Sequence, residues 1–267
     1  METKVDDVTL RYEVRGEGDP VLFLHGFPLS GAMWDPVVDR LADGWRCIVP
    51  DLRGMGGSGA GPVDGIADYA DDAARVLDAL GETRPVVVVG MSMGGYVAFA
   101  FCRAYPERVR ALALVDTREE ADTEETARGR RETAEKALKE GSAAIADDMV
   151  GKLFAAGAPE DLKARWRNVI ASTPPEGVAA ALRAMAERPD STGTLRALDR
   201  PVLVVVGGED AVTPVRDARR MADTAGQATL EVVPGAGHMA VVEAPEPVAS
   251  SLRRFLGGLP AAAQGGR

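Results

Sequence analysis

The sequence predicts an α/β fold in which helices cover both faces of a mostly parallel, eight-stranded sheet and a helical insertion lies above one edge. Three observations predict it. Short runs rich in valine, leucine and isoleucine alternate with helical patterns, several runs are apolar at every position, and the alternation stops after the fifth run and later resumes. Strands that are apolar throughout are typical of a parallel sheet buried on both faces.

The predicted strands and helices follow one another in chain order. Strands are predicted where β-branched and other apolar residues cluster, at 9–14, 21–24, 47–49, 86–89, 111–115, 202–206 and 230–233. Helices are predicted where apolar residues recur with helical spacing, at 34–41, 67–80, 93–105, 215–222 and 247–255. Each of these helices follows a strand, and such a crossover is what neighbouring parallel strands require.

The segment 118–195 interrupts this alternation. It contains no predicted strand, and it is rich in Ala, Glu, Arg and Lys with helical spacing. Its apolar set needs a surface to pack on and consists of Ile145, Met149, Leu153, Phe154, Leu182 and Met185. We therefore predict a core made of 1–117 and 196–267 and a helical cap at 118–195, with a solvated helical hairpin as the alternative. The Ala- and Gly-rich tail 261–267 is expected to be disordered.

Composition excludes several classes of partner and site. The net charge of -10 has the wrong sign for a surface that neutralises phosphates, so we expect no nucleic-acid partner. Two cysteines cannot build a disulfide framework, and two histidines cannot form a multi-histidine metal site. The chain shows neither a signal segment nor a membrane-length apolar run. We therefore expect a cytoplasmic protein without a membrane partner, either a monomer or a small homo-oligomer.

The motif Gly90-Met91-Ser92-Met93-Gly94-Gly95 lies between a predicted strand and a predicted helix and matches G-x-S-x-G. A serine in such a sharp turn is held in a strained backbone conformation that presents its hydroxyl at the carboxyl end of the sheet. Small neighbours are needed because other chain segments approach closely. The motif predicts that Ser92 is a nucleophile.

A serine nucleophile needs a base, and the base needs an acid that holds its tautomer. His238 follows the last predicted strand and is the predicted base, and Asp210 follows the preceding strand and is the predicted acid. The chain order Ser, Asp, His is the order that accompanies this motif. Asp116 and Glu209 are the alternative acids, although the position of Asp116 where the insertion begins also suits a hinge or capping role.

The other histidine, His25, directly follows the second predicted strand. A role as base is possible, but the alternative is that His25-Gly26 shapes a turn. In that turn the backbone N–H of Phe27, together with that of Met93, would stabilise a substrate oxyanion. The glycines 54–59 match G-x-G-x-x-G, but they lead into Ala-Gly-Pro and not into a helix, which argues against a dinucleotide site.

Taken together, these motifs resemble the α/β-hydrolase superfamily over nearly the whole chain. The stretches H-G-F-P-L-S-G-A-M-W at 25–34 and P-D-L-R-G-M-G-G-S at 50–58 are characteristic of it. The chain is most similar to small bacterial carboxylesterases in G-M-S-M-G-G-Y-V-A-F-A-F from Gly90, V-D-T-R from Val115, and two segments of the predicted cap, 174–181 and 186–192. The resemblance implies a Ser-His-Asp esterase with a four-helix cap and no cofactor.

We predict hydrolysis of small, short-acyl carboxylic esters through an acyl-enzyme on Ser92. The substrate pocket is expected to be lined by Phe27, Met93, Met149, Phe154, Met185, Val212 and Met239. Cofactor-free perhydrolases or haloperoxidases and enol-lactonases share the scaffold and triad, so they stay open as alternatives. A non-enzymatic small-ligand sensor is the alternative of another class, because a fold does not fix a function.

Overall fold

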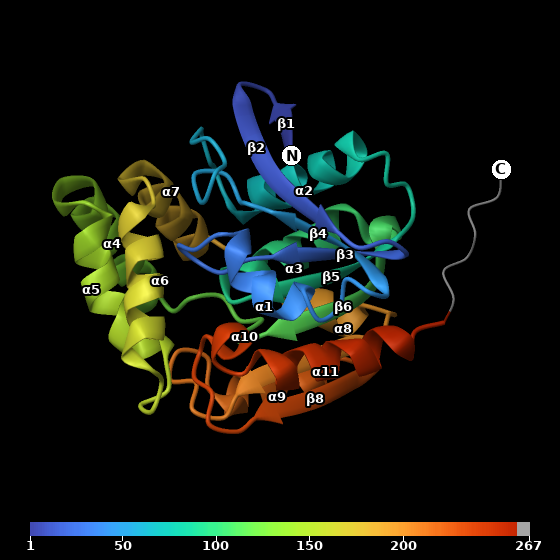
Figure 1. Cartoon of the computed structure of the whole chain (residues 1–267). Helices are drawn as coiled ribbons and strands as arrows, with labels where there is room; N and C mark the ends of the chain where they lie inside the picture. The colour runs from blue at the N-terminus through green and yellow to red at the C-terminus, as the bar shows by residue number, and fades with distance from the viewer. Residues whose placement is uncertain (261–267) are drawn as a thin grey trace.

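A single sheet runs through the protein, whose computed structural model describes residues 1–260 (Figure 1). Within these residues eight strands pair in the order β1-β2-β4-β3-β5-β6-β7-β8. Pairing is antiparallel between β1 and β2 and between β2 and β4, and parallel elsewhere. The mostly parallel, eight-stranded sheet predicted from the sequence is thus confirmed. Its strands are β1 (Glu2–Val5), β2 (Val8–Arg15), β3 (Asp19–Leu24), β4 (Trp45–Pro50), β5 (Val86–Met91), β6 (Val109–Val115), β7 (Val202–Gly207) and β8 (Ala228–Val233).

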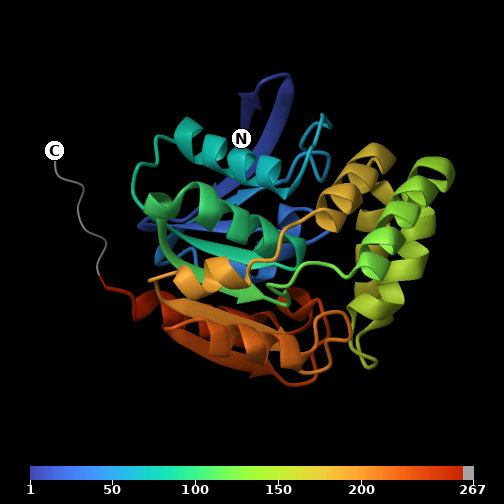
Figure 2. The same ribbon diagram turned by 180° about the vertical axis from the view of Figure 1, so that it is seen from behind.

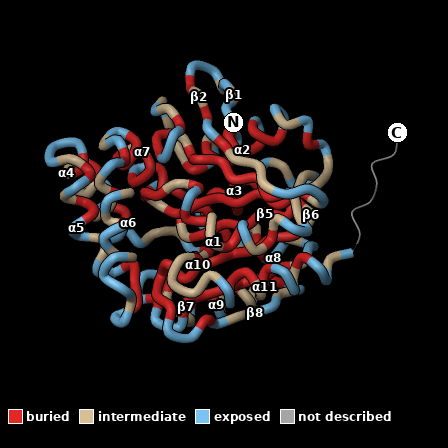
Figure 3. Tube along the Cα trace, viewed as in Figure 1, coloured by how far each residue is buried: buried red, intermediate tan, exposed pale blue. Residues whose placement is uncertain are grey.

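Helices cover both faces of the sheet because its strands are apolar on both sides. On β3, Leu22 and Leu24 join one apolar cluster, whereas Val21 and Phe23 join the other. The first cluster includes helices that Figure 2 shows in front of the sheet, namely α2 (Ile66–Ala79), α3 (Met93–Ala104), α8 (Thr192–Ala197) and α9 (Val215–Thr224). The second includes α1 (Asp35–Val38), α10 (Ala240–Glu243) and α11 (Pro245–Gly257). The central strands between the two layers are buried almost throughout (Figure 3).

The strand order reverses at β3, near the edge of the sheet where the parallel strands have their carboxyl ends. The chain passes from β3 to β4 on one side and then returns to β5 on the other side. In open sheets of this kind, ligands bind in the crevice beyond such a reversal. The segments that follow β3 and β5 begin at His25 and Ser92, so the topology brings both predicted motifs to one place.

Four helices lie together at the end of the sheet in Figure 1: α4 (Glu124–Glu140), α5 (Ser142–Leu153), α6 (Glu160–Ser172) and α7 (Pro175–Ala186). We refer to them as the α4–α7 group, in which α4 packs on α7 and α5 packs on α6. The following helix, α8, packs on α3 and α9 instead. The predicted end of the insertion at residue 195 falls inside α8, whose Leu195 is buried in the first cluster.

The structure differs from the sequence prediction at β1 and at the predicted helix 34–41, and it leaves one expectation outside its range. The edge strand β1 was not predicted, because Glu-Thr-Lys-Val is half-exposed and carries no apolar run. The predicted helix 34–41 is a 3-10 turn at Gly31–Trp34 followed by the short α1, because Pro36 has no N–H to donate to a preceding turn and so favours the start of a new helix. The tail 261–267 lies outside the described residues.

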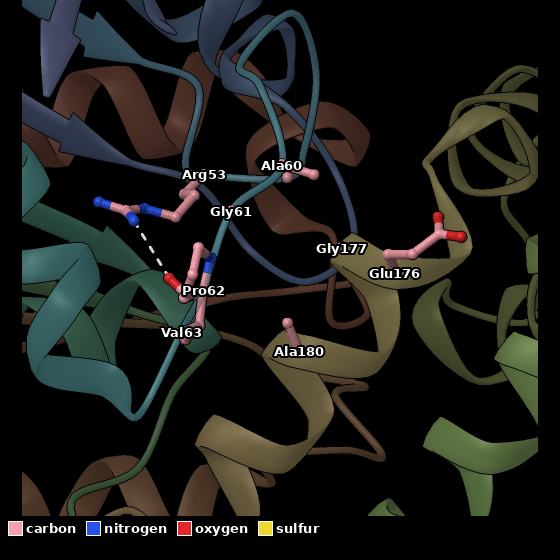
Figure 4. Close-up of a pocket in the computed structure, with 9 residues that line it drawn as sticks. Arg53, Ala60, Gly61, Pro62, Val63, Glu176, Gly177 and Ala180 are labelled. Atoms are coloured by element: carbon pink, nitrogen blue, oxygen red, sulfur yellow. Dashed lines mark hydrogen bonds between the residues drawn. The ribbon is translucent and has the colours of Figure 1, made fainter. Parts of the chain in front are cut away.

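A backbone-to-backbone contact joins the α4–α7 group to the glycine-rich loop 54–59. Gly54 has a φ of +74°. Its backbone lies so close to Gly177 of α7 that a Cβ added to Gly177 would lie 2.0 Å from the Gly54 carbonyl oxygen. Figure 4 shows Arg53 and residues 60–63, which flank this loop, opposite α7 across a cavity of about 320 Å³. Arg53 donates there to the Pro62 carbonyl at 3.1 Å. No helix follows the loop before α2, and Gly54 is the glycine of the loop that makes this contact, whereas a Cβ on Gly56 would meet the Asp51 carboxyl group.

Gly177→Ala is expected to lower the free energy of unfolding by about 1–3 kcal/mol, because the new methyl group forces α7 away from the loop. Gly129→Ala in α4 is the matched control, since a Cβ there would meet nothing within 4 Å. That control should gain up to about 1 kcal/mol from helix propensity. Urea unfolding of both variants measures the difference, and equal stabilities would contradict the described contact.

Candidate active site

Ser92 lies at the sharp turn between β5 and α3. Its backbone has a φ of +52° and a ψ of -117°, a region that side-chain-bearing residues rarely adopt. Hydrogen bonds on both sides hold the turn: Ser92 N–H donates to the Val115 carbonyl at 3.0 Å, and the Thr117 hydroxyl donates to the Ser92 carbonyl at 2.7 Å. The strained turn that the motif predicts is thus held by β6 and by Thr117, which follows it.

Two glycines of the motif are required by close backbone approach. A Cβ on Gly90 would lie 2.3 Å from the Gly94 carbonyl oxygen, and one on Gly94 would lie 2.1 Å from the Leu24 carbonyl oxygen. Both contacts are with backbone atoms, which cannot rotate away as a side chain could. The start of α3 is thus pressed against the end of β3, which brings the Ser92 turn beside the His25 loop.

His238 connects Ser92 to Asp210. It lies in the loop after β8, where its side chain is almost fully buried. Its Nε2 lies 2.9 Å from Ser92 Oγ, and its Nδ1 lies 2.8 Å from Asp210 Oδ2. The structure therefore brings the predicted nucleophile, base and acid into one hydrogen-bonded line. With Nδ1–H donating to the carboxylate, Nε2 is free to accept the serine proton.

The Asp210 carboxylate is held by more donors than His238 alone. Its Oδ1 accepts from the backbone N–H groups of Val212 and Thr213 at 2.7 and 2.8 Å, and its Oδ2 accepts from the Thr213 hydroxyl at 2.6 Å. Burial acts to raise the pKa of Asp210, but the hydrogen bonds from His238 and Thr213 outweigh it and hold the pKa below its usual value. Thr213 was not predicted from the sequence, although an Asp at the start of a turn commonly accepts from the backbone N–H groups two and three residues later.

The two alternative acids lie elsewhere. Asp116 is fully buried, and its oxygens accept from the Gly207 and Ala240 backbone N–H groups at 2.7 and 3.3 Å. Burial, together with the nearby charge of Asp210, raises the pKa of Asp116 well above its usual value. Glu209 is exposed. Asp116 thus ties the end of β7 to the start of α10, just after His238, which is a positioning role.

His25 is a fully buried structural residue in this arrangement. Its Nδ1 lies 2.9 Å from the Gly26 carbonyl, and its Nε2 accepts from the Leu52 backbone N–H at 2.8 Å. Burial lowers the pKa of His25, which favours the neutral ring that these two bonds require. The ring links the loop after β3 to the loop after β4, so the turn-shaping interpretation fits its contacts and the base role does not.

Two backbone N–H groups remain available beside Ser92. Met93 is the first residue of α3, so its N–H has no partner within the helix. Among residues 1–260, neither the Met93 N–H nor the Phe27 N–H donates a hydrogen bond to the protein. The amino end of a helix favours negative charge, so these groups suit the oxyanion that we predict them to bind.

A cavity of about 430 Å³ lies between the Ser92 turn and the α4–α7 group. Its wall consists of Phe27, Ser92, Tyr96, Arg130, Thr133, Ile145, Asp148, Met149, Lys152, Leu153, Met185, Val212 and His238. Four of the predicted wall residues, Phe27, Met149, Met185 and Val212, therefore line it. The helices of the insertion close over the same cavity that exposes Ser92, which places them where a cap would act.

Three predicted wall residues do not line the cavity. The Met93 side chain packs into the first apolar cluster, and Phe154 and Met239 pack into the second. Phe154 and Met239 are kept from the cavity because the segment after β8 packs closely on the end of α5. The Met239 N–H donates to the Leu153 carbonyl at 3.0 Å, and a Cβ on Gly237 would meet the Phe154 backbone. Both side chains are therefore enclosed behind the wall.

The polar part of the wall was not predicted from the sequence. Five polar residues line the cavity without having been candidates, namely Tyr96, Arg130, Thr133, Asp148 and Lys152. Charged residues on an amphipathic helix are most often solvated, so spacing alone gives no signal that these face a site. Arg188, also missed, lies with its guanidinium carbon 4.0 Å from the centre of the Tyr96 ring and so holds that ring in place.

None of the helices between residues 1 and 260 is both long and apolar enough to cross a membrane.

Comparisons with known proteins agree with this architecture. A family model described as "alpha/beta hydrolase fold" matches residues 19–245. A thermophilic esterase from Thermogutta terrifontis, solved with malate bound, is 42% identical with a TM-score of 0.93, covering 97% of this chain and 98% of that one. The enol-lactonase from Burkholderia xenovorans LB400 is 25% identical with a TM-score of 0.89, covering 96% and 100%. A pimeloyl–acyl-carrier protein methyl ester esterase from Chromobacterium violaceum is 30% identical, covering 86% and 91%.

Proposed function

The chain belongs to the alpha/beta hydrolase fold family, and on that premise we propose that it is a serine carboxylesterase for small esters with short acyl chains. One observation carries the proposal: Ser92 Oγ, His238 and Asp210 form a continuous hydrogen-bonded line at the wall of a cavity. The 42% identical structure and the 30% identical relative, both named as esterases, support it.

The proposed reaction begins with acylation of Ser92. His238 Nε2 takes the proton of Ser92 Oγ as that oxygen attacks the ester carbonyl carbon, and Asp210 stabilises the imidazolium that forms. The Phe27 and Met93 N–H groups bind the oxygen that becomes negative. Collapse of the tetrahedral intermediate breaks the bond to the alkoxy group, which leaves as the alcohol with the proton from His238.

Deacylation repeats these steps with water in place of the serine. His238 takes a proton from water, the hydroxide adds to the acyl carbon, and the bond to Ser92 Oγ breaks as that oxygen recovers a proton. The products are a carboxylic acid and free Ser92. Within this proposal the α4–α7 group acts as the cap that limits the size of the acyl group.

Enol-lactone hydrolysis is the second candidate reaction, because the same Ser92, His238 and Asp210 could carry it out. The 25% identical enol-lactonase, whose structure matches over 96% of this chain, supports it. Perhydrolysis differs only in the final nucleophile, hydrogen peroxide in place of water. A ligand sensor would bind esters without turning them over. Assays with esters, an enol-lactone and peroxide separate these possibilities.

We expect kcat/KM for soluble p-nitrophenyl esters to be higher for acetyl to butyryl groups than for decanoyl and longer groups. The cavity of about 430 Å³ has Met149 and Met185 in its wall, so long chains must displace side chains of the α4–α7 group. The preference should decline gradually, since one methylene in such a pocket is worth about 1–3 kcal/mol. Equal or higher values for the long esters would contradict a compact acyl pocket, and no hydrolysis of any ester would contradict the proposed function.

The cytoplasm is the compartment that we propose. Cys47 and Cys102 are both free and buried, and burial raises the pKa of each thiol to about 12. Reduced thiols of this kind suit a reducing compartment, which supports the proposal.

A further inference from the structure

Two cations face the cavity that holds Ser92 and His238. Arg130 comes from α4 and Lys152 from the last turn of α5, and both line its wall beside Met149 and Met185. The chain as a whole carries a net charge of -10. Positive groups at the one cavity that also contains the proposed nucleophile therefore suggest that its ligand is negatively charged.

The charge of Arg130 is only partly balanced by its neighbours. Its Nε donates to Asp122 at 2.5 Å, but the same carboxylate also pairs with Arg188 at 2.7 Å. Asp122 and Arg188 are both almost fully buried, so this shared carboxylate leaves one positive charge uncompensated. Arg130 Nη1 lies 3.4 Å from Met185 Sδ, which places that end of the guanidinium at the cavity wall.

Lys152 has no acidic partner in the part of the chain that the structure describes. No carboxylate oxygen of residues 1–260 lies within 4.0 Å of its Nζ. The one acidic residue of the wall, Asp148, pairs instead with Lys136, at 2.5 Å. Lys136 does not line the cavity, so the acidic charge of the wall is balanced from outside and neutralises neither Arg130 nor Lys152.

We propose that the cavity accepts esters that carry a second, ionised carboxylate, such as half-esters of short dicarboxylic acids. Arg130 and Lys152 would bind that carboxylate while Ser92 attacks the ester carbonyl at the other end. The half-buried Arg130 guanidinium presents paired N–H donors that match a carboxylate, and the exposed Lys152 ammonium adds a second positive charge at the wall. Hydrolysis would release an alcohol and a dicarboxylate. This inference rests on the proposed esterase function.

The test compares monomethyl glutarate with methyl 4-carbamoylbutanoate, in which a neutral amide replaces the carboxylate. For the native chain, kcat/KM should be about 100-fold higher for the half-ester, as expected for two charge-assisted contacts worth about tenfold each. Arg130→Gln and Lys152→Gln should each lower this ratio about tenfold. Arg131→Gln is the matched control, because Arg131 lies on the same helix, pairs with Glu187 at 2.6 Å and does not line the cavity. Its ratio should not change.

Glutarate binding, measured by calorimetry, gives a readout that does not depend on turnover. We expect about tenfold weaker binding in Arg130→Gln and in Lys152→Gln, and Lys152→Gln keeps the test valid if loss of Arg130 disturbs folding. A ratio near one in the native chain, or ratios unaffected by either change, would overturn the inference while the esterase proposal stands. Arg130-dependent glutarate binding without hydrolysis of any ester would overturn the esterase proposal but support the anion site.

Discussion

Ser92→Ala is expected to lower kcat for ester hydrolysis by about 10⁴- to 10⁶-fold, the range measured when a member of such a triad is removed. Among the described residues, no other hydroxyl of the cavity wall lies within hydrogen-bond distance of His238 Nε2, so no other side chain can replace Ser92 as the nucleophile. Kinetics with p-nitrophenyl butyrate measure the loss. The fold should persist, since alanine keeps the backbone N–H that bonds to the Val115 carbonyl.

Ser172→Ala is the matched control for this change. Ser172 is an exposed serine near the end of α6, away from the cavity wall, and its replacement should leave kcat unaltered. Retention of more than about a tenth of the native activity by Ser92→Ala, with the control active, would show that the nucleophile is a different group.

Asp210→Asn is expected to lower kcat by about 10⁴-fold, far more than Asp116→Asn. The Asp210 carboxylate accepts from His238 Nδ1, whereas an amide would favour the wrong imidazole tautomer and lose the charge that stabilises the imidazolium. Asp116 accepts from the backbone N–H groups of Gly207 in β7 and Ala240 in α10, so its replacement should lower stability more than turnover. Both variants are compared by kcat and by thermal unfolding.

A larger loss of kcat in Asp116→Asn than in Asp210→Asn would show that the acid is Asp116, which directly follows β6. Comparable losses of kcat in both variants, with both proteins folded, would mean that the backbone at Gly207 and Ala240, which Asp116 holds in place, matters as much as the charge of Asp210. Neither result is expected from the hydrogen bonds in the structure.

The layers of the fold could be predicted because burial leaves a strong pattern in the sequence. Strands such as β5 and β7 are apolar at nearly every position since helices cover both of their faces. The edge strand β1 lacks this pattern because it is paired on one side only and is half-exposed. The predicted end of the cap at residue 195 lies inside α8, and the packing of that helix on α3 and α9 joins segments far apart in the sequence, which leaves no local pattern.

The hydrogen-bonded line of Ser92, His238 and Asp210 could be predicted because the chain order and the small number of histidines restrict the choice of base and acid. With two histidines in the chain, and one of them directly after β3, few arrangements of base and acid were possible. The cavity wall could not be predicted in the same way. Whether Arg130 faces a cavity or the solvent depends on how α4 packs on α7, a contact between segments about 50 residues apart that leaves no periodic signal in either.

Covalent labelling by a fluorophosphonate, followed by peptide mass spectrometry, tests the central claim most directly. Attack of Ser92 Oγ on phosphorus displaces fluoride and leaves a stable phosphonyl ester on that residue. The proposed mechanism predicts one adduct per chain, located on Ser92, and its loss in Ser92→Ala and near-loss in Asp210→Asn. An adduct on another residue, or an unlabelled chain that still hydrolyses esters, would contradict the assignment of Ser92 as the nucleophile.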